Sequence, residues 1–198
     1  MAKVTQNGRA LQMIFPAAIC EEANIRAGNE YDVTSFGNVV SLIPKEISHQ
    51  NADDDSPVIY TIGYESRTLD KFIWRLKSNG IQQVIDVREL PISRKKGFSK
   101  NTLKEILNEN GIKYVHLPEL GSPSDLRHEY KNGGSELQFF SDYQRYVDEN
   151  CRKDIQILEQ YASMCRSAMM CFELTYVHCH RKILAEKLAL DGYRVVHL

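Results

Sequence analysis

Short apolar runs alternate with stretches of helical periodicity from residue 57 onward, and this alternation constrains the fold more than any other feature of the chain. Between the first two runs, Leu69, Phe72 and Leu76 recur at the spacing of one helix face. Strands that alternate with helices favour a parallel sheet covered on both faces. Residues 57–198 therefore predict an α/β, Rossmann-like, mostly parallel sheet. The expected strands are 58–62, 84–87, 114–117, 168–173 and 194–198, and the expected helices lie near 69–79, 99–110, 138–149, 152–164 and 180–190.

The first quarter of the chain has a different pattern, with short β-rich pieces and turns. Its order of pieces resembles the AbrB/MazE/SpoVT swapped-hairpin family. The matching pieces are Ile14-Phe15-Pro16, residues 25–33, and a closing strand at 39–44. We therefore expect a small β-rich swapped-hairpin domain over 1–46, followed by a polar, acidic linker at 47–56.

The resemblance implies a homodimer formed through residues 1–46 and contact with DNA through basic side chains. The basic residues that match this role are Lys3, Arg9 and Arg26, but acidic residues outnumber them in this part of the chain. Because phosphate contact supplies most non-specific affinity for nucleic acid, dimerisation is favoured over strong DNA binding.

Composition narrows the class of protein. The formal net charge of −1 gives no global field for nucleic acid or membrane. No apolar run approaches the roughly 18 residues of a membrane span, and no signal-peptide pattern follows Met1. Five cysteines without a disulfide framework indicate free thiols, so we expect a cytoplasmic protein without a membrane partner.

Polar residues follow the expected strands at their carboxyl ends, where open α/β sheets bind ligands. They include Gly63 after the first strand, Asp86 and Arg88 after the second, and His116 with Glu119 after the third. The segment 171–181 supplies the rest, because it packs Glu173, Cys179, His180 and Arg181 into eleven residues.

Ordered motifs over 58–198 resemble the domain-of-unknown-function 488 family. These motifs are 61–65, Asp86-Val87-Arg88, 91–100, 114–121, Cys171-Phe172-Glu173, Cys179-His180-Arg181 and the terminal His197-Leu198. Two motifs depart from the usual pattern, with Tyr64-Glu65 in place of His-Ser in one and Phe172 in place of Ala in the other. The resemblance implies a Rossmann-like fold and an enzyme without an assigned reaction.

Three hypotheses compete for this edge of the sheet, and the first is an anion site. Arg88, Arg94 and Arg181, with Gly63 and Asp86 beside them, could hold a phosphate near the helix that begins after Cys179. Lys95 and Lys96 extend the basic loop toward a nucleic acid. In the alternative, the arginines only pair with Asp86, Glu119 or Glu173.

The second hypothesis is thiol chemistry and the third is a metal. Cys179 at a helix N-terminus could be a nucleophile, with His180 or His116 as base, unless it is only a buried packing residue. A metal held by Cys171, Cys179, His180 and His116 is disfavoured, because the gap between the cysteines is not a common zinc spacing. We therefore expect no metal and no cofactor.

Together these features predict an enzyme acting on a nucleotide or a nucleic acid. Arg88, Arg94 and Arg181 would bind phosphate, and Glu173, Glu119 and His116 would be the acid and base candidates. The alternative is a non-catalytic DNA-binding regulator whose second domain senses a nucleotide-like ligand.

Overall fold

The computed structural model describes residues 3–7, 10–14, 31–36, 39–44 and 56–198. The chain divides into two compact units, Met1–Asp55 and Ser56–Leu198, and the boundary falls within the predicted linker. The two units are described separately below. None of the described helices is both long enough and apolar enough to cross a membrane.

The first unit contains two antiparallel strand pairs. Strand β1 (Lys3–Asn7) pairs with β2 (Ala10–Ile14), and β3 (Tyr31–Phe36) pairs with β4 (Val39–Pro44). The second pair includes the closing strand expected at 39–44. Arg9 and Arg26 lie outside the described residues, whereas Lys3 begins β1.

The second unit contains a five-stranded, all-parallel sheet, so the predicted α/β fold class is confirmed. Its strands lie in the order β7-β6-β8-β5-β9. Their bounds are β5 (Val58–Gly63), β6 (Gln83–Asp86), β7 (Lys113–His116), β8 (Ser167–Cys171) and β9 (Arg194–His197).

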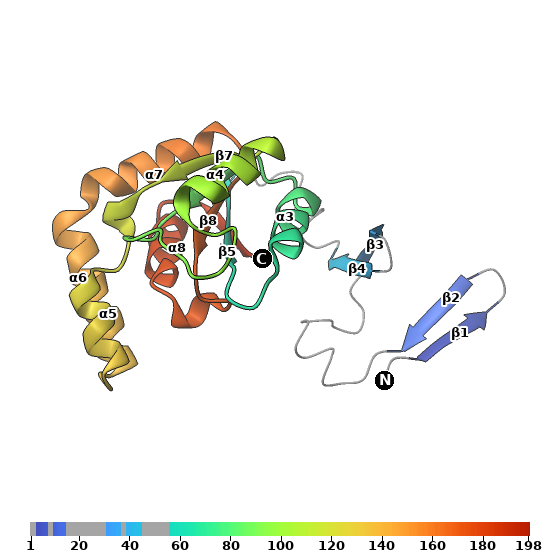
Figure 1. Cartoon of the computed structure of the whole chain (residues 1–198), viewed down its shortest axis with the longest axis horizontal. Helices are drawn as coiled ribbons and strands as arrows, with labels where there is room; N and C mark the ends of the chain where they lie inside the picture. The colour runs from blue at the N-terminus through green and yellow to red at the C-terminus, as the bar shows by residue number, and fades with distance from the viewer. Residues whose placement is uncertain (1–2, 8–9, 15–30, 37–38, 45–55) are drawn as a thin grey trace. The chain divides into compact units, whose positions relative to one another are not determined.

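Helices cover both faces of this sheet (Figure 1). Helices α3 (Leu69–Ser78) and α4 (Lys100–Glu109) pack on one face, where Phe72, Leu76 and Leu107 meet the strand residues Ile62 and Met170. Helices α6 (Glu136–Asn150), α7 (Arg152–Met164) and α8 (Arg181–Leu190) pack on the other.

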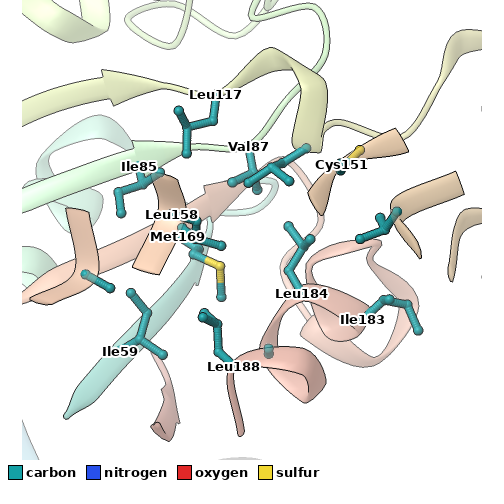
Figure 2. Packing of buried hydrophobic residues seen from close by; sticks show 14 of the residues in the cluster. Ile59, Ile85, Val87, Leu117, Cys151, Leu158, Met169, Ile183, Leu184 and Leu188 are labelled. Atoms are coloured by element: carbon teal, nitrogen blue, oxygen red, sulfur yellow. The ribbon is translucent and has the colours of Figure 1, made fainter. Parts of the chain in front are cut away.

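Figure 2 shows the core on the second face, where aliphatic side chains from strands and helices interdigitate. Ile59, Ile85 and Met169 point from three adjacent strands toward Leu184 and Leu188 of α8, and all five are completely buried. Burying such a side chain contributes about 1.5–3 kcal/mol. This packing fixes α8, and with it the start of that helix, against the sheet.

One helix was not predicted. Helix α5 (Ser124–Lys131) lies between the expected strand 114–117 and the expected helix 138–149, and none of its side chains is fully buried. Its only apolar side chains at helical spacing are Leu126 and Tyr130, too few for a periodicity signal. Two short 3-10 helices, η1 (Pro118–Leu120) and η2 (Tyr176–His178), flank the carboxyl ends of β7 and β8.

The strand order singles out the carboxyl end of β8. The chain leaves β5 and β6 through α3 and α4 on one face, but it leaves β8 through α8 on the other face. Strand β8 lies between β5 and β6. The connection that follows β8 therefore crosses one face of the sheet, while those that follow its two neighbours cross the other face. Open α/β sheets place their ligands at such reversals.

Candidate functional site

Four side chains that can each bind a metal converge at the carboxyl end of β8. Cys171 is the last residue of that strand, Glu173 follows it, and Cys179 and His180 precede α8. The ligating atoms of the four residues all lie within 4.8 Å of one another. The Cys171 Sγ lies 3.0 Å from Glu173 Oε2 and 3.6 Å from His180 Nδ1, and the Cys179 Sγ lies 3.8 Å from the same nitrogen.

The two sulfur–nitrogen separations are close to the edge of a tetrahedral zinc site. With Zn–S near 2.3 Å and Zn–N near 2.0–2.1 Å, a tetrahedral angle places sulfur and nitrogen about 3.6 Å apart. Cys171, Cys179 and His180 are buried, whereas Glu173 is partly exposed. The set therefore combines three buried ligands of the kind zinc prefers with one carboxylate near solvent.

His180 is held in the orientation that metal ligation needs. Its Nε2 lies 2.8 Å from the carbonyl oxygen of Val87, a residue of the adjacent β6 turn. That nitrogen must carry a proton to donate, which leaves Nδ1 available toward the two sulfur atoms in the neutral ring. Metal-binding histidines are usually fixed by such a second hydrogen bond.

The segment after Cys171 is held down by backbone contacts. The carbonyl oxygen of Phe172 accepts from the amides of Tyr64 and Glu65 at 3.1 and 2.9 Å. A Cβ on Gly63 would lie 1.8 Å from the carbonyl oxygen of Glu173, so only glycine allows the segment to cross here. The predicted ligand-binding Gly63 therefore has a structural role in positioning Glu173.

Arg181 braces the same segment from the other side. Its Nη1 donates to the carbonyl oxygen of Glu173 at 2.7 Å, and its Nη2 donates to that of Leu174 at 3.0 Å. The side chain is almost completely buried. Two of its donor groups thus stabilise the loop that carries the cluster's carboxylate.

The cluster favours one thiolate. Burial opposes ionisation of Cys171, but the hydrogen bond from Cys179 and the positive charge of His180 outweigh it and lower the pKa of Cys171 well below its usual value. Burial and the neighbouring Cys171 raise the pKa of Cys179. Burial and the charge of Cys171 likewise raise the pKa of Glu173. Of the two thiols, Cys171 is the one whose surroundings favour the thiolate, whereas the sequence analysis proposed Cys179 as the nucleophile.

The predicted phosphate ligands Asp86 and Arg88 form a buried ion pair. Arg88 Nε donates to Asp86 Oδ1 at 2.8 Å and Nη2 donates to Oδ2 at 2.6 Å. Arg88 Nη1 donates to the hydroxyl of Tyr64 at 2.7 Å and to the carbonyl of Phe98 at 3.0 Å. Tyr114 donates its hydroxyl to Asp86 at 2.6 Å. Because protein acceptors occupy these donors, the alternative of a structural ion pair describes Arg88 best.

Two residues of the basic loop, Lys95 and Phe98, also make their contacts within the protein. Phe98 is completely buried and stacks on Tyr64 with ring centroids 4.3 Å apart, so it offers no face to a nucleic-acid base. Lys95 donates its ammonium to the carbonyl oxygens of Tyr64 and Glu65. Arg94 and Lys96 are exposed on this loop.

The remaining acid and base candidates lie outside the cluster. His116 Nε2 is 2.8 Å from the carbonyl oxygen of Arg88, and its Nδ1 is 3.0 Å from the Lys100 ammonium. Glu119 is exposed on η1 and helps to raise the pKa of Tyr146 and Cys151. His116 is therefore not among the four clustered ligands, and neither is Glu119.

Sequence reasoning missed two groups of residues. Tyr64 and Tyr114 complete the buried network around Asp86, and only their place beside expected strands could have suggested it. Arg67 and Arg75 each bury a guanidinium nitrogen without an acceptor, a property that no sequence pattern indicates.

One of the three comparisons with known proteins found a match. The model of the family "Domain of unknown function DUF488" matches residues 68–188. No curated protein and no solved structure matches the chain. The matched segment runs from the N-terminal cap of α3 into α8 and includes all four clustered ligands. The chain therefore belongs to the family of domain of unknown function DUF488.

Proposed function

We propose that residues 56–198 form a metal-dependent enzyme domain whose metal is bound by Cys171, Cys179, His180 and Glu173. The observation that carries the proposal is the convergence of these four ligating atoms within 4.8 Å of one another. Two sulfurs and an imidazole nitrogen favour zinc over magnesium or calcium, which prefer oxygen ligands. This proposal replaces the expectation of no metal.

The exposure of the four ligands supports a catalytic centre. A structural zinc site is closed, whereas a catalytic one keeps a position open to water or substrate. Glu173 is the ligand nearest solvent, so it is the one that water or a substrate would displace. Bound zinc would supply a polarised water near neutral pH, and Glu173, once displaced, would be positioned to accept its proton.

Metal analysis tests the ligand set directly. We expect about one zinc per chain in the purified protein. Replacing zinc with cobalt(II) should give thiolate-to-cobalt charge-transfer absorption, which reports sulfur ligation. Cys171→Ser and His180→Ala should abolish both signals. Cys165→Ser is the matched control, because Cys165 is a free, partly exposed thiol outside the cluster.

A metal content below about 0.2 per chain, unchanged after incubation with zinc, would overturn the proposal. The low pKa of Cys171 favours a second function in that case, with this thiolate as a nucleophile beside His180. Alkylation by iodoacetamide would then be fastest at Cys171 in metal-free protein, and His180→Ala would slow it.

Three further expectations stay predictions. The substrate predicted from the sequence is a nucleotide or a nucleic acid, and the exposed Arg94 and Lys96 are the basic residues that remain available to it. The swapped-hairpin resemblance of residues 1–46 predicts a homodimer, which light scattering would test. DNA or RNA binding through Lys3, Arg9 and Arg26 predicts an affinity that falls steeply with salt.

A further inference from the structure

Three arginine side chains of the second unit share an unusual property. Arg67, Arg75 and Arg181 each bury the Nε atom without any hydrogen-bond acceptor. Native proteins seldom leave a buried donor unpaired, since each one costs about 1–3 kcal/mol and more when the group is charged. Three such donors on neighbouring cations indicate acceptors that a ligand would supply.

The charges of these arginines are not neutralised by acidic side chains. Among residues 56–198, no Asp or Glu forms an ion pair with any of the three. Burial and the charges of Arg75 and Arg181 lower the pKa of Arg67 to about 10. Burial and Arg181 also lower the pKa of His197 to about 4. A cation-rich region of this kind attracts an anion.

The position of the arginines fits a ligand site. Arg67 lies between the end of β5 and the start of α3, and Arg181 is the first residue of α8. Both therefore border the sheet edge at which the connections diverge. Arg67 also donates to the carbonyl oxygen of Leu198 at 3.1 Å, while its Nε stays unpaired.

We infer that Arg67, Arg75 and Arg181 bind a phosphate group beside the clustered metal ligands. Guanidinium groups bind phosphate oxygens through paired, charge-assisted hydrogen bonds. The site differs from the one predicted from the sequence, because Arg88 is engaged with Asp86 and Arg94 lies on the exposed loop. It does not depend on the metal, although Arg181 contacts the backbone of Glu173 and so places the phosphate next to it.

Calorimetric titration of the full chain with inorganic phosphate and with a nucleoside 5′-monophosphate tests this inference. Both titrations are run at constant ionic strength, with and without a chelator, so that phosphate bound by a metal is distinguished from phosphate bound by arginine. Binding of both ligands identifies a phosphate group as the recognised unit. Tighter binding of the nucleotide shows that the phosphate belongs to a larger substrate.

Arg67→Gln and Arg75→Gln should each weaken phosphate binding at least about tenfold, the effect of losing one charge-assisted contact of about 1.4 kcal/mol. Arg152→Gln is the matched control, because Arg152 is exposed at the start of α7, and it should bind within about twofold of the parent. The thermal midpoint of unliganded Arg75→Gln should not fall, because the Arg75 side chain makes no hydrogen bond or ion pair with any residue in 56–198 and its Nε is buried. A merely structural Arg75 would lower it.

Three results would overturn the inference. The first is no binding of either ligand at about 10 mM, far above the range expected for a built phosphate site. The second is an equal loss of affinity in Arg152→Gln. The third is binding that disappears when the chelator is added.

Discussion

Replacing Asp86 with alanine should destabilise the second unit by about 3–5 kcal/mol. The side chain is completely buried, and its two oxygens accept from Arg88 at 2.8 and 2.6 Å and from Tyr114 at 2.6 Å. Removing one partner of a buried ion pair leaves the other charge uncompensated, which costs about this amount. For a unit of this size, the midpoint of thermal unfolding should fall by about 10 °C.

A double-mutant cycle in urea separates this cause from a general packing defect. We expect Asp86→Leu with Arg88→Met to be less destabilised than the sum of the two single variants, because no lone charge stays buried. Asp125→Ala is the control, since Asp125 is exposed on α5 and should change stability by less than about 0.5 kcal/mol. A loss below about 1 kcal/mol for Asp86→Ala, or strict additivity in the cycle, would refute the reasoning.

Three other predictions concern the frame around the site. Gly63→Ala should cost about 3 kcal/mol or more and reduce metal content, because its Cβ would lie 1.8 Å from the Glu173 carbonyl oxygen; an unchanged urea midpoint would contradict this. Thr68→Ala should cost about 1 kcal/mol, since the Thr68 hydroxyl accepts from the Lys71 amide at the start of α3, whereas Thr68→Ser should retain most of that stability. Burial and Arg181 lower the pKa of His197 to about 4, so as the pH falls the unfolded chain takes up this proton at a higher pH than the folded chain does. The free energy of unfolding should therefore be highest above about pH 6.5 and should decline as the pH falls toward 4. Chemical denaturation of His197→Gln should show a shallower decline, and an identical one would count against this assignment.

The sequence predicted the sheet well because its three central strands, β5, β6 and β8, are buried and their sequences are rich in apolar residues. It could not predict the strand order, which depends on packing between elements far apart along the chain. It missed α5, because that helix has only Leu126 and Tyr130 as apolar side chains at helical spacing. The sequence analysis also disfavoured a metal, only because the gap between Cys171 and Cys179 is not a common zinc spacing. A strand that ends at Cys171 and a helix that begins at Arg181 bring Cys171 and Cys179 together across a loop, and short zinc motifs do not describe that geometry.

The charge of Arg88 misled the sequence interpretation for a related reason. An arginine at the end of a strand is equally compatible with a ligand and with a buried partner, and only the position of Asp86 two residues earlier decides between them. In the folded unit, Arg88 donates to both oxygens of that carboxylate. The charge of Arg88 is thereby neutralised by Asp86. The buried donors without an acceptor belong to Arg67, Arg75 and Arg181.

The ion pair and the metal ligands are nevertheless mechanically connected. Val87 lies between Asp86 and Arg88, its amide donates to Met170 of β8, and its carbonyl accepts from His180. Fixing the two flanking side chains therefore fixes the acceptor that sets the protonation of the His180 ring. Loss of such an outer hydrogen bond typically lowers metal affinity about 10–100-fold. Asp86→Ala should consequently weaken zinc binding in protein that is still folded at low temperature, whereas Thr68→Ala should reduce stability and leave the affinity unchanged.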